Sequence, residues 1–286
     1  MGQALRATQM KKVGITGATG RLATILIRQL KDEYQLKLFS FEKPECTDAE
    51  TLQTEKETYD TTVVDLSDRD QVKGLFEGLD VVIHLAAYSL AVPFPEQGPH
   101  VVFKNNVEAT YHVLEECVRA NVKRYLEDRF IFASTNHTQN GSMCADPAKP
   151  ESLDVARIKP GTDFVFPDSL YAVSKTCGED LCKLFSLHKR IATVVFRIGW
   201  IRLNDDPSDL KGTINEAYMR AMYLSQRDAG NFFRKAIEGE MKPAASGIPF
   251  MIAYAVSNND ARVYDLEETI ATLGYVPQDN SEAYFQ

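Results

Sequence analysis

The stretch TGATGRLA, residues 16–23, decides the fold, because it joins an apolar segment to an amphipathic one through two glycines. KKVGIT (11–16) has the character of a buried strand, and ATILIRQLKDEY (23–34) is compatible with a helix. Gly17 permits a tight turn, Gly20 lets a diphosphate approach the backbone, and Ala23 allows close helix–sheet packing. At a first strand–helix turn, this spacing predicts a dinucleotide site at the helix N-terminus. The alternative, a glycine-rich turn without a ligand, fits this position less well.

Strand-like and helix-like segments alternate through the next 170 or so residues, which predicts a doubly wound parallel sheet of the Rossmann type. The predicted strands are 35–41, 61–66, 80–87, 128–134 and 191–198, the helices are 68–79, 101–121 and 169–189, and a long loop spans 138–167.

The alternation ends after Gly199. Helices are expected at 215–224, 225–239 and 265–274, with a strand at 249–257. This tail is too short for an independent domain. We therefore divide the chain into an NAD(P)-binding Rossmann region, 11–198, and a substrate-binding C-terminal cap of the same domain, 199–286.

Composition narrows the function classes. The chain has 286 residues and a formal net charge of −8, which argues against non-specific binding to nucleic acid or to an anionic membrane. Five cysteines without a C-x-x-C pair suggest reduced thiols. No apolar run reaches the ~20 residues of a membrane span, and the N-terminus lacks the apolar core of a signal peptide. We expect a cytoplasmic protein without a metal.

Two further constellations carry chemistry. Tyr171 and Lys175 are four residues apart in a predicted helix, so the phenol and the ammonium share one face. A neighbouring cation is expected to lower the pKa of the phenol and make it a general acid/base. The other reading of Y-x-x-x-K is an ordinary surface pair. Thr135, Asn136 and His137 follow the fifth predicted strand, at the sheet edge where ligands bind in open α/β folds.

Together these motifs resemble the extended short-chain dehydrogenase/reductases, the NAD-dependent epimerase/dehydratase group, over nearly the whole chain. The resemblance implies that Asn106 supports a proton relay near Lys175. Family members carry an acidic residue at the end of the second strand, where this chain has Ser40, Phe41 and Glu42. The resemblance implies NAD, and NADP stays an alternative, because Arg21 and Lys43 could accept a 2′-phosphate where Glu42 could reach the ribose hydroxyls. The implied dinucleotide-binding residues are Gly17, Thr19, Gly20, Arg21, Leu22, Ser40, Glu42, Asp65, Leu66, Leu85, Ala86, Ala87, Asn106, Tyr171 and Lys175.

A narrower resemblance, in ASTNH (133–137), RIGW (197–200) and LGYVPQDNSEAY (273–284), is to uronate dehydrogenases and archaeal-type NAD-dependent glucose-6-phosphate dehydrogenases. It implies oxidation of the anomeric carbon of a hexuronate or hexose 6-phosphate to a lactone. The catalytic residues would be Thr135, Tyr171, Lys175 and Asn106. The sugar would contact Ser89, Thr135, Asn136, His137, Tyr171, Trp200 and Arg220.

Both of these sugars are anions, so a cation is expected at the far end of the site, with Arg220 ahead of Arg202 and Arg227. Trp200 replaces a small hydroxylated residue of the uronate enzymes, which favours the hexose 6-phosphate. The alternatives are a nucleotide-sugar epimerase or dehydratase and a non-catalytic dinucleotide-binding regulator. Relatives also imply a homodimer through 101–121 and 169–189, with Val113, Cys117, Leu181 and Phe185 as candidate contacts unless these face the sheet.

Overall fold

A computed structural model of the chain describes residues 10–42, 61–89, 98–122, 129–141, 165–239 and 247–286. Its centre is one seven-stranded sheet of order β3-β2-β1-β4-β5-β6-β7. Every neighbouring pair of strands is parallel, as predicted. The strands are β1 Lys12–Thr16, β2 Gln35–Ser40, β3 Thr61–Val63, β4 Val81–His84, β5 Arg129–Thr135, β6 Ala192–Ile198 and β7 Phe250–Ala255.

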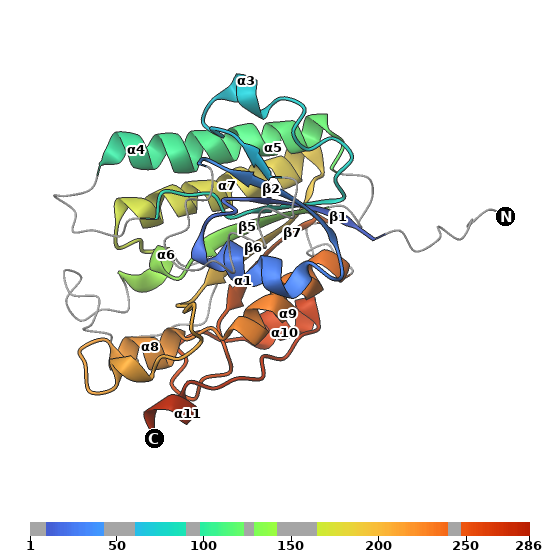
Figure 1. The fold of residues 1–286 in the computed structure, drawn as a ribbon. Helices are drawn as coiled ribbons and strands as arrows, with labels where there is room; N and C mark the ends of the chain where they lie inside the picture. Colours follow the sequence, from blue (N-terminus) through green and yellow to red (C-terminus); the bar gives the residue numbers. More distant parts are fainter. Residues whose placement is uncertain (1–9, 43–60, 90–97, 123–128, 142–164, 240–246) are drawn as a thin grey trace.

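Helices cover both faces of the sheet (Figure 1). Apolar side chains of α1 (Arg21–Leu30) and α9 (Gln226–Glu238) form one core with the strands. Side chains of α5 (Ala109–Arg119) and α7 (Leu170–Lys189) form a second core on the opposite face. Strands enclosed on both sides need apolar residues at nearly every position. β5 and β6 lie between the two helical layers and are buried along their whole length.

Two predicted helices differ from the structure. The helix expected at 68–79 is confined to α3 (Arg69–Val72), because Gly74 and Gly78 adopt positive φ values of 81° and 75°. The helix expected at 101–121 is divided into α4 (Pro99–Phe103), a π-helical turn (Lys104–Glu108) and α5. Such π turns occur frequently at functional sites. The loop expected at 138–167 begins instead within the short helix α6 (His137–Asn140). Residues 142–164 of this loop lie outside the described residues.

The C-terminal part is more than a cap. β7 pairs with β6 and extends the main sheet, and α9 packs beside α1. A division of the chain at residue 198 therefore separates β6 from β7, its neighbour in the sheet. The remaining elements are a 3₁₀ turn (Ser208–Leu210), α8 (Glu216–Met222), α10 (Glu267–Leu273) and α11 (Glu282–Phe285). None of the described helices is long and apolar enough to cross a membrane.

Replacing Gly17 by alanine should lower the free energy of unfolding by about 2–4 kcal/mol, combining a left-handed backbone with a steric clash. Gly17 has φ +68°, and an added Cβ would lie 2.7 Å from the Ala86 backbone. Gly20→Ala is the matched control, because Gly20 has φ −75° and its Cβ would lie 3.2 Å from the nearest atom. Urea denaturation measures both losses. Equal losses would contradict this account of the turn.

Candidate active site

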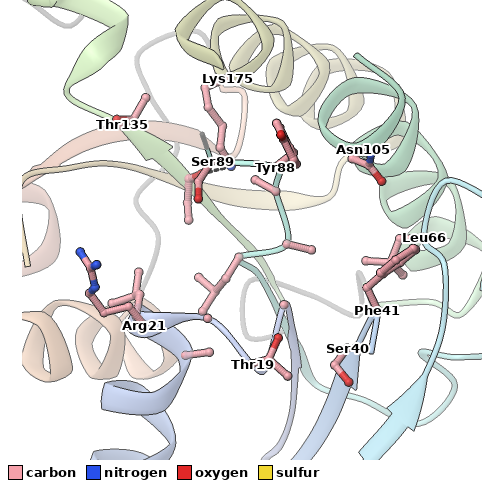
Figure 2. A pocket seen from close by; sticks show the side chains of 18 of the residues that line it. Thr19, Arg21, Ser40, Phe41, Leu66, Tyr88, Ser89, Asn105, Thr135 and Lys175 are labelled. Atoms are coloured by element: carbon pink, nitrogen blue, oxygen red, sulfur yellow. Dashed lines mark hydrogen bonds between the residues drawn. The ribbon is translucent and has the colours of Figure 1, made fainter. Parts of the chain in front are cut away.

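A cavity of about 750 Å³ opens at the carboxyl ends of the strands. This is within the usual size range of ligand pockets. Figure 2 shows Thr135 and Lys175 at one end and Ser40, Phe41 and Leu66 at the other. The predicted residues that line it are Gly17, Thr19, Gly20, Arg21, Leu22, Ser40, Glu42, Asp65, Leu66, Leu85, Ala86, Ala87, Ser89, Thr135, Tyr171, Lys175 and Trp200.

The cavity floor fits a dinucleotide. α1 begins at Arg21, and the residues of its first turn line the cavity, where its free amides could donate hydrogen bonds to a diphosphate. The glycine turn packs directly on the loop after β4, where the Ala86 amide donates to Thr16 Oγ1 at 3.2 Å. Because Gly17 has no Cβ, the two loops meet without a side chain between them. The donor set and the shape of the floor therefore suit the group that the sequence predicts.

The far end of the cavity lies beside the end of β2. The Ser40 hydroxyl donates to the Glu42 carbonyl at 2.7 Å, so Ser40 is engaged with its own loop. Asp65 Oδ1 accepts hydrogen bonds from the Ser67 amide and hydroxyl. Phe41 is 62% exposed and forms part of the wall. Glu42 is the carboxylate that follows β2 at this wall.

At the other end, Thr135 lies beside Tyr171. Burial raises the pKa of the phenol to about 12, and the Thr135 hydroxyl acts in the opposite direction and lowers it. The carboxylate of Asp168 raises it further. Lys175 is not among the causes of this shift, so its part in lowering the phenol pKa stays a prediction. Thr135 is the group that favours the phenolate.

Lys175 is directed at the backbone. Its Nζ donates to the Ala133 carbonyl at 2.7 Å and lies 6.0 Å from the centre of the Tyr171 ring. It also lies 4.7 Å from the centre of the Phe132 ring. Burial lowers the pKa of this ammonium to about 8. Lys175 thus tethers the Tyr171 helix to the end of β5 while still lining the cavity.

Asn106 lies behind the cavity wall and does not line it. Its Oδ1 accepts the Tyr88 amide at 2.6 Å, and its Nδ2 donates to the Ser174 hydroxyl at 2.8 Å. Asn106 comes from the π-helical turn, so this turn joins the loop after β4 to α7. The structure gives it a bridging position, whereas the resemblance implied a place in a proton relay.

Ser134 and Thr135 point to different partners. The Ser134 hydroxyl donates to Glu179 Oε1 at 2.5 Å, and Glu179 also accepts Arg197 Nε at 3.0 Å. Thr135 lines the cavity with Tyr171, and its Oγ1 accepts the His137 amide at 3.3 Å and donates to Asn136 Oδ1 at 3.4 Å. This difference supports Thr135, rather than Ser134, as the residue at the reactive end. Glu179 is a supporting residue that the motif search missed, although it lies one helical turn after Lys175.

Asn136 and His137 belong to a polar cluster beside Thr135 that is outside the cavity lining. His137 Nδ1 lies 2.7 Å from Asp168 Oδ2, and its ring meets the Tyr171 ring edge-on at 6.3 Å. Asn136 and Asn140 both donate to the Tyr218 hydroxyl. Sequence reasoning missed Asn140, Asp168 and Tyr218. Asn140 follows Asn136 by four residues, a signal for a shared helix face, whereas Tyr218 reaches the cluster only through the tertiary fold.

Arg220 is also outside the cavity lining. Its Nε donates to Glu282 Oε1 at 2.9 Å, its second terminal nitrogen pairs with the other oxygen of that carboxylate, and Nη1 lies 3.2 Å from Glu216 Oε1. The guanidinium also lies over the Phe285 ring. The structure thus places Arg220 in the packing of α8 against α11, and Arg220 is not among the described residues that line the cavity.

Comparison with known proteins gives the family. The model of the NAD dependent epimerase/dehydratase family matches residues 13–201. The chain belongs to this family. It is 30% identical to L-arabinose 1-dehydrogenase (NAD(P)(+)) of Haloferax volcanii, over 95% of this chain and 98% of that one. It is 31% identical to NAD-dependent glucose-6-phosphate dehydrogenase of the same organism, over 94% of each chain.

A solved structure has a similar fold. Uronate dehydrogenase from Agrobacterium tumefaciens matches with a TM-score of 0.73 at 23% identity, over 96% of this chain and 87% of that one. The predicted Rossmann-type fold, the family and its NAD cofactor are confirmed. In this NAD dependent family member, the described residues contain no group of three or more side chains able to hold a metal ion.

Thr135→Val should lower kcat about 10- to 100-fold, because a hydrogen bond to a charged oxygen contributes roughly 1.5–3 kcal/mol. Thr135→Ser keeps the hydroxyl and should stay active. Ser134→Ala should instead reduce stability, since it removes a partner of the buried Glu179. Steady-state kinetics and urea denaturation of the three variants separate these effects. Loss of kcat in Ser134→Ala with normal kcat in Thr135→Val would show that the two roles are exchanged.

Proposed function

We propose that the protein is a sugar dehydrogenase that oxidises the anomeric carbon of an aldose to a lactone, with NAD as hydride acceptor. The observation that carries the proposal is that Thr135, Tyr171 and Lys175 line the same cavity as the glycine turn and the end of β2. The relatives support it, because three sets of them are named as dehydrogenases of sugars: arabinose, glucose 6-phosphate and uronates.

The side chains divide the work. When bound, oxidised nicotinamide accepts the hydride and brings a positive charge that favours the nearby phenolate. Tyr171 accepts the proton of the C1 hydroxyl, and Thr135 holds the reacting oxygen by a hydrogen bond. Lys175 fixes α7 against β5 through Ala133 and contributes a positive charge to the wall. Asn106 fixes the opposite wall through Tyr88.

The dinucleotide-binding set proposed from the sequence stays as stated, with Asn106 acting from behind the wall. Asn136 and His137 contact the sugar in this proposal from the edge of the cavity, next to Thr135. NADP should be tested beside NAD, because Glu42 and Arg21 both line the cavity. Glu42 would repel the 2′-phosphate of NADP, whereas Arg21 would attract it.

Two competing functions make different predictions. A nucleotide-sugar epimerase would bind and turn over a nucleotide-linked sugar. A non-catalytic regulator would bind NAD without turnover. The intact Tyr171–Thr135 pair favours an enzyme over a regulator.

Tyr171→Phe should reduce kcat by at least about 10²-fold, the usual contribution of a general acid–base group. The dissociation constant for NAD should change little, because the ring and the helix remain. Absorbance of reduced nicotinamide with a panel of aldoses measures turnover, with NAD and with NADP. Retained wild-type kcat would exclude Tyr171 as the base. NAD binding by the wild type without turnover of any sugar would favour a regulator.

We also propose a homodimer through one surface of α4, α5 and α7. Val113 and Cys117 are fully buried in the core between the sheet and these helices, so they are not dimer contacts. Apolar side chains do remain exposed on these helices: Phe103 36%, Tyr111 42%, Leu184 50% and Leu187 47%. Tyr111 meets the buried Phe185 edge-on at 5.8 Å, so α5 and α7 pack against each other here.

Leu184→Glu should convert this dimer to a monomer, since it places a charge in an apolar contact. Ile214→Glu is the matched control, because Ile214 is 66% exposed and lies outside these helices. Light scattering at micromolar concentration gives the mass of each variant. A monomeric wild type would contradict the proposal.

A further inference from the structure

We propose that the sugar oxidised at Tyr171 is uncharged, an aldose with neither phosphate nor carboxylate, and that Trp200 is the side chain that selects it. This goes deeper into the proposed function and rests on it, because it names the substrate class of the same site. Four features of the described residues lead to it: the engagement of the arginines, the cavity wall, a nearby carboxylate and the fixed indole.

The arginine best placed in sequence to hold an anion is already paired. Arg220 is shared between Glu282 and Glu216, with hydrogen bonds to both carboxylates. A sugar anion would have to displace at least one of them. Two carboxylates left beside the new anion would then repel it, so the exchange is unfavourable.

The rival arginines are paired in the same way. Arg202 lies 2.7 Å from Asp209 Oδ2, and Arg227 Nε lies 3.0 Å from Asp279 Oδ2. Neither is among the described residues that line the cavity.

Among those lining residues, the cations are Arg21 and Lys175. Arg21 is the first residue of α1, where the dinucleotide diphosphate is expected. Lys175 donates to the Ala133 carbonyl and lies at the reactive end of the cavity, close to Tyr171. Neither is therefore available at the far end of the sugar.

A buried carboxylate lies beside the reactive end. The Asp168 side chain is 8% exposed, and its Oδ1 is buried without a hydrogen-bond partner, while Oδ2 faces His137. This carboxylate is close enough to Tyr171 to raise the pKa of the phenol. A second anion bound there would meet the same charge. A neutral sugar adds hydroxyl donors to this region instead.

Trp200 supplies the surface that a neutral sugar needs. Trp200 is one of the residues that line the cavity, and its backbone is fixed by hydrogen bonds to Met222 and Leu224. The ring packs on Tyr218 at 5.8 Å, and the Tyr218 hydroxyl accepts Asn140 at 2.8 Å. The indole is thus held between the cavity and the polar cluster. It offers an apolar face and one N–H donor, but no charge to balance an anion.

The first experiment measures kcat/KM for neutral pentoses and hexoses against a hexose 6-phosphate and a hexuronate, at saturating NAD and low salt. We expect neutral sugars to be favoured at least tenfold. Binding is checked without turnover, because Trp200 is the only tryptophan of the chain. In Tyr171→Phe protein saturated with NAD, neutral sugars should change Trp200 fluorescence at lower concentration than the anionic ones.

Three variants then test the residues. Trp200→Ser should lower kcat/KM for neutral sugars about tenfold and bring the neutral-to-anionic ratio toward one, whereas Trp200→Phe should retain the preference. Arg220→Gln should leave the ratio as it is in the wild type. An unchanged ratio in Trp200→Ser would overturn the role of Trp200. A selective loss of anionic sugars in Arg220→Gln would overturn the assignment of Arg220.

Wild-type turnover confined to anionic sugars would overturn the substrate class and leave the proposed dehydrogenase standing. Absence of turnover with every sugar, together with tight NAD binding, would overturn the proposed function itself. The two failures are therefore distinguishable in one set of assays.

Discussion

One buried ion pair orders the reactive end of this molecule. Glu179 of α7 accepts two hydrogen bonds from Arg197 of β6 and one from Ser134 of β5, and all three residues are nearly excluded from solvent. Burying two charges is costly unless every donor and acceptor has suitable geometry. Removing one partner leaves an uncompensated charge, which costs about 3–5 kcal/mol. The pair therefore constrains α7 against two neighbouring strands.

This constraint has a direct consequence for chemistry. Lys175 is one turn before Glu179 on α7, and Tyr171 one turn before that. Thr135 directly follows Ser134. When Glu179 holds Ser134, the next residue of β5 is placed against Tyr171, and Lys175 reaches the carbonyl of Ala133. A fixed register between strand and helix thus positions Thr135 relative to Tyr171, as catalytic groups require.

Sequence reasoning was accurate where the signal is local. A short window contains the spacing that predicts the glycine turn at 16–23 and the Tyr171–Lys175 helix. The alternation of strands and helices predicts the parallel sheet. It failed where tertiary contacts decide. No window around Arg220 reveals Glu282, 62 residues later, and no window around Asn136 reveals Tyr218. The predicted helix at 68–79 failed for a local reason, since Gly74 and Gly78 take positive φ. β7 was read as part of a cap because strand order cannot be deduced from the pattern of a single strand.

The electrostatics of Tyr171 link these observations. Burial and Asp168 both raise the pKa of the phenol, so this region resists additional negative charge. The phenolate that the proposed reaction needs is itself an anion, and it must form beside that carboxylate. Thr135 and the positive charge of oxidised nicotinamide offset part of the cost. An anionic group on the sugar would add to the cost in the same low-dielectric volume. A site arranged in this way does its chemistry most easily on a substrate that brings hydroxyl groups and no charge of its own.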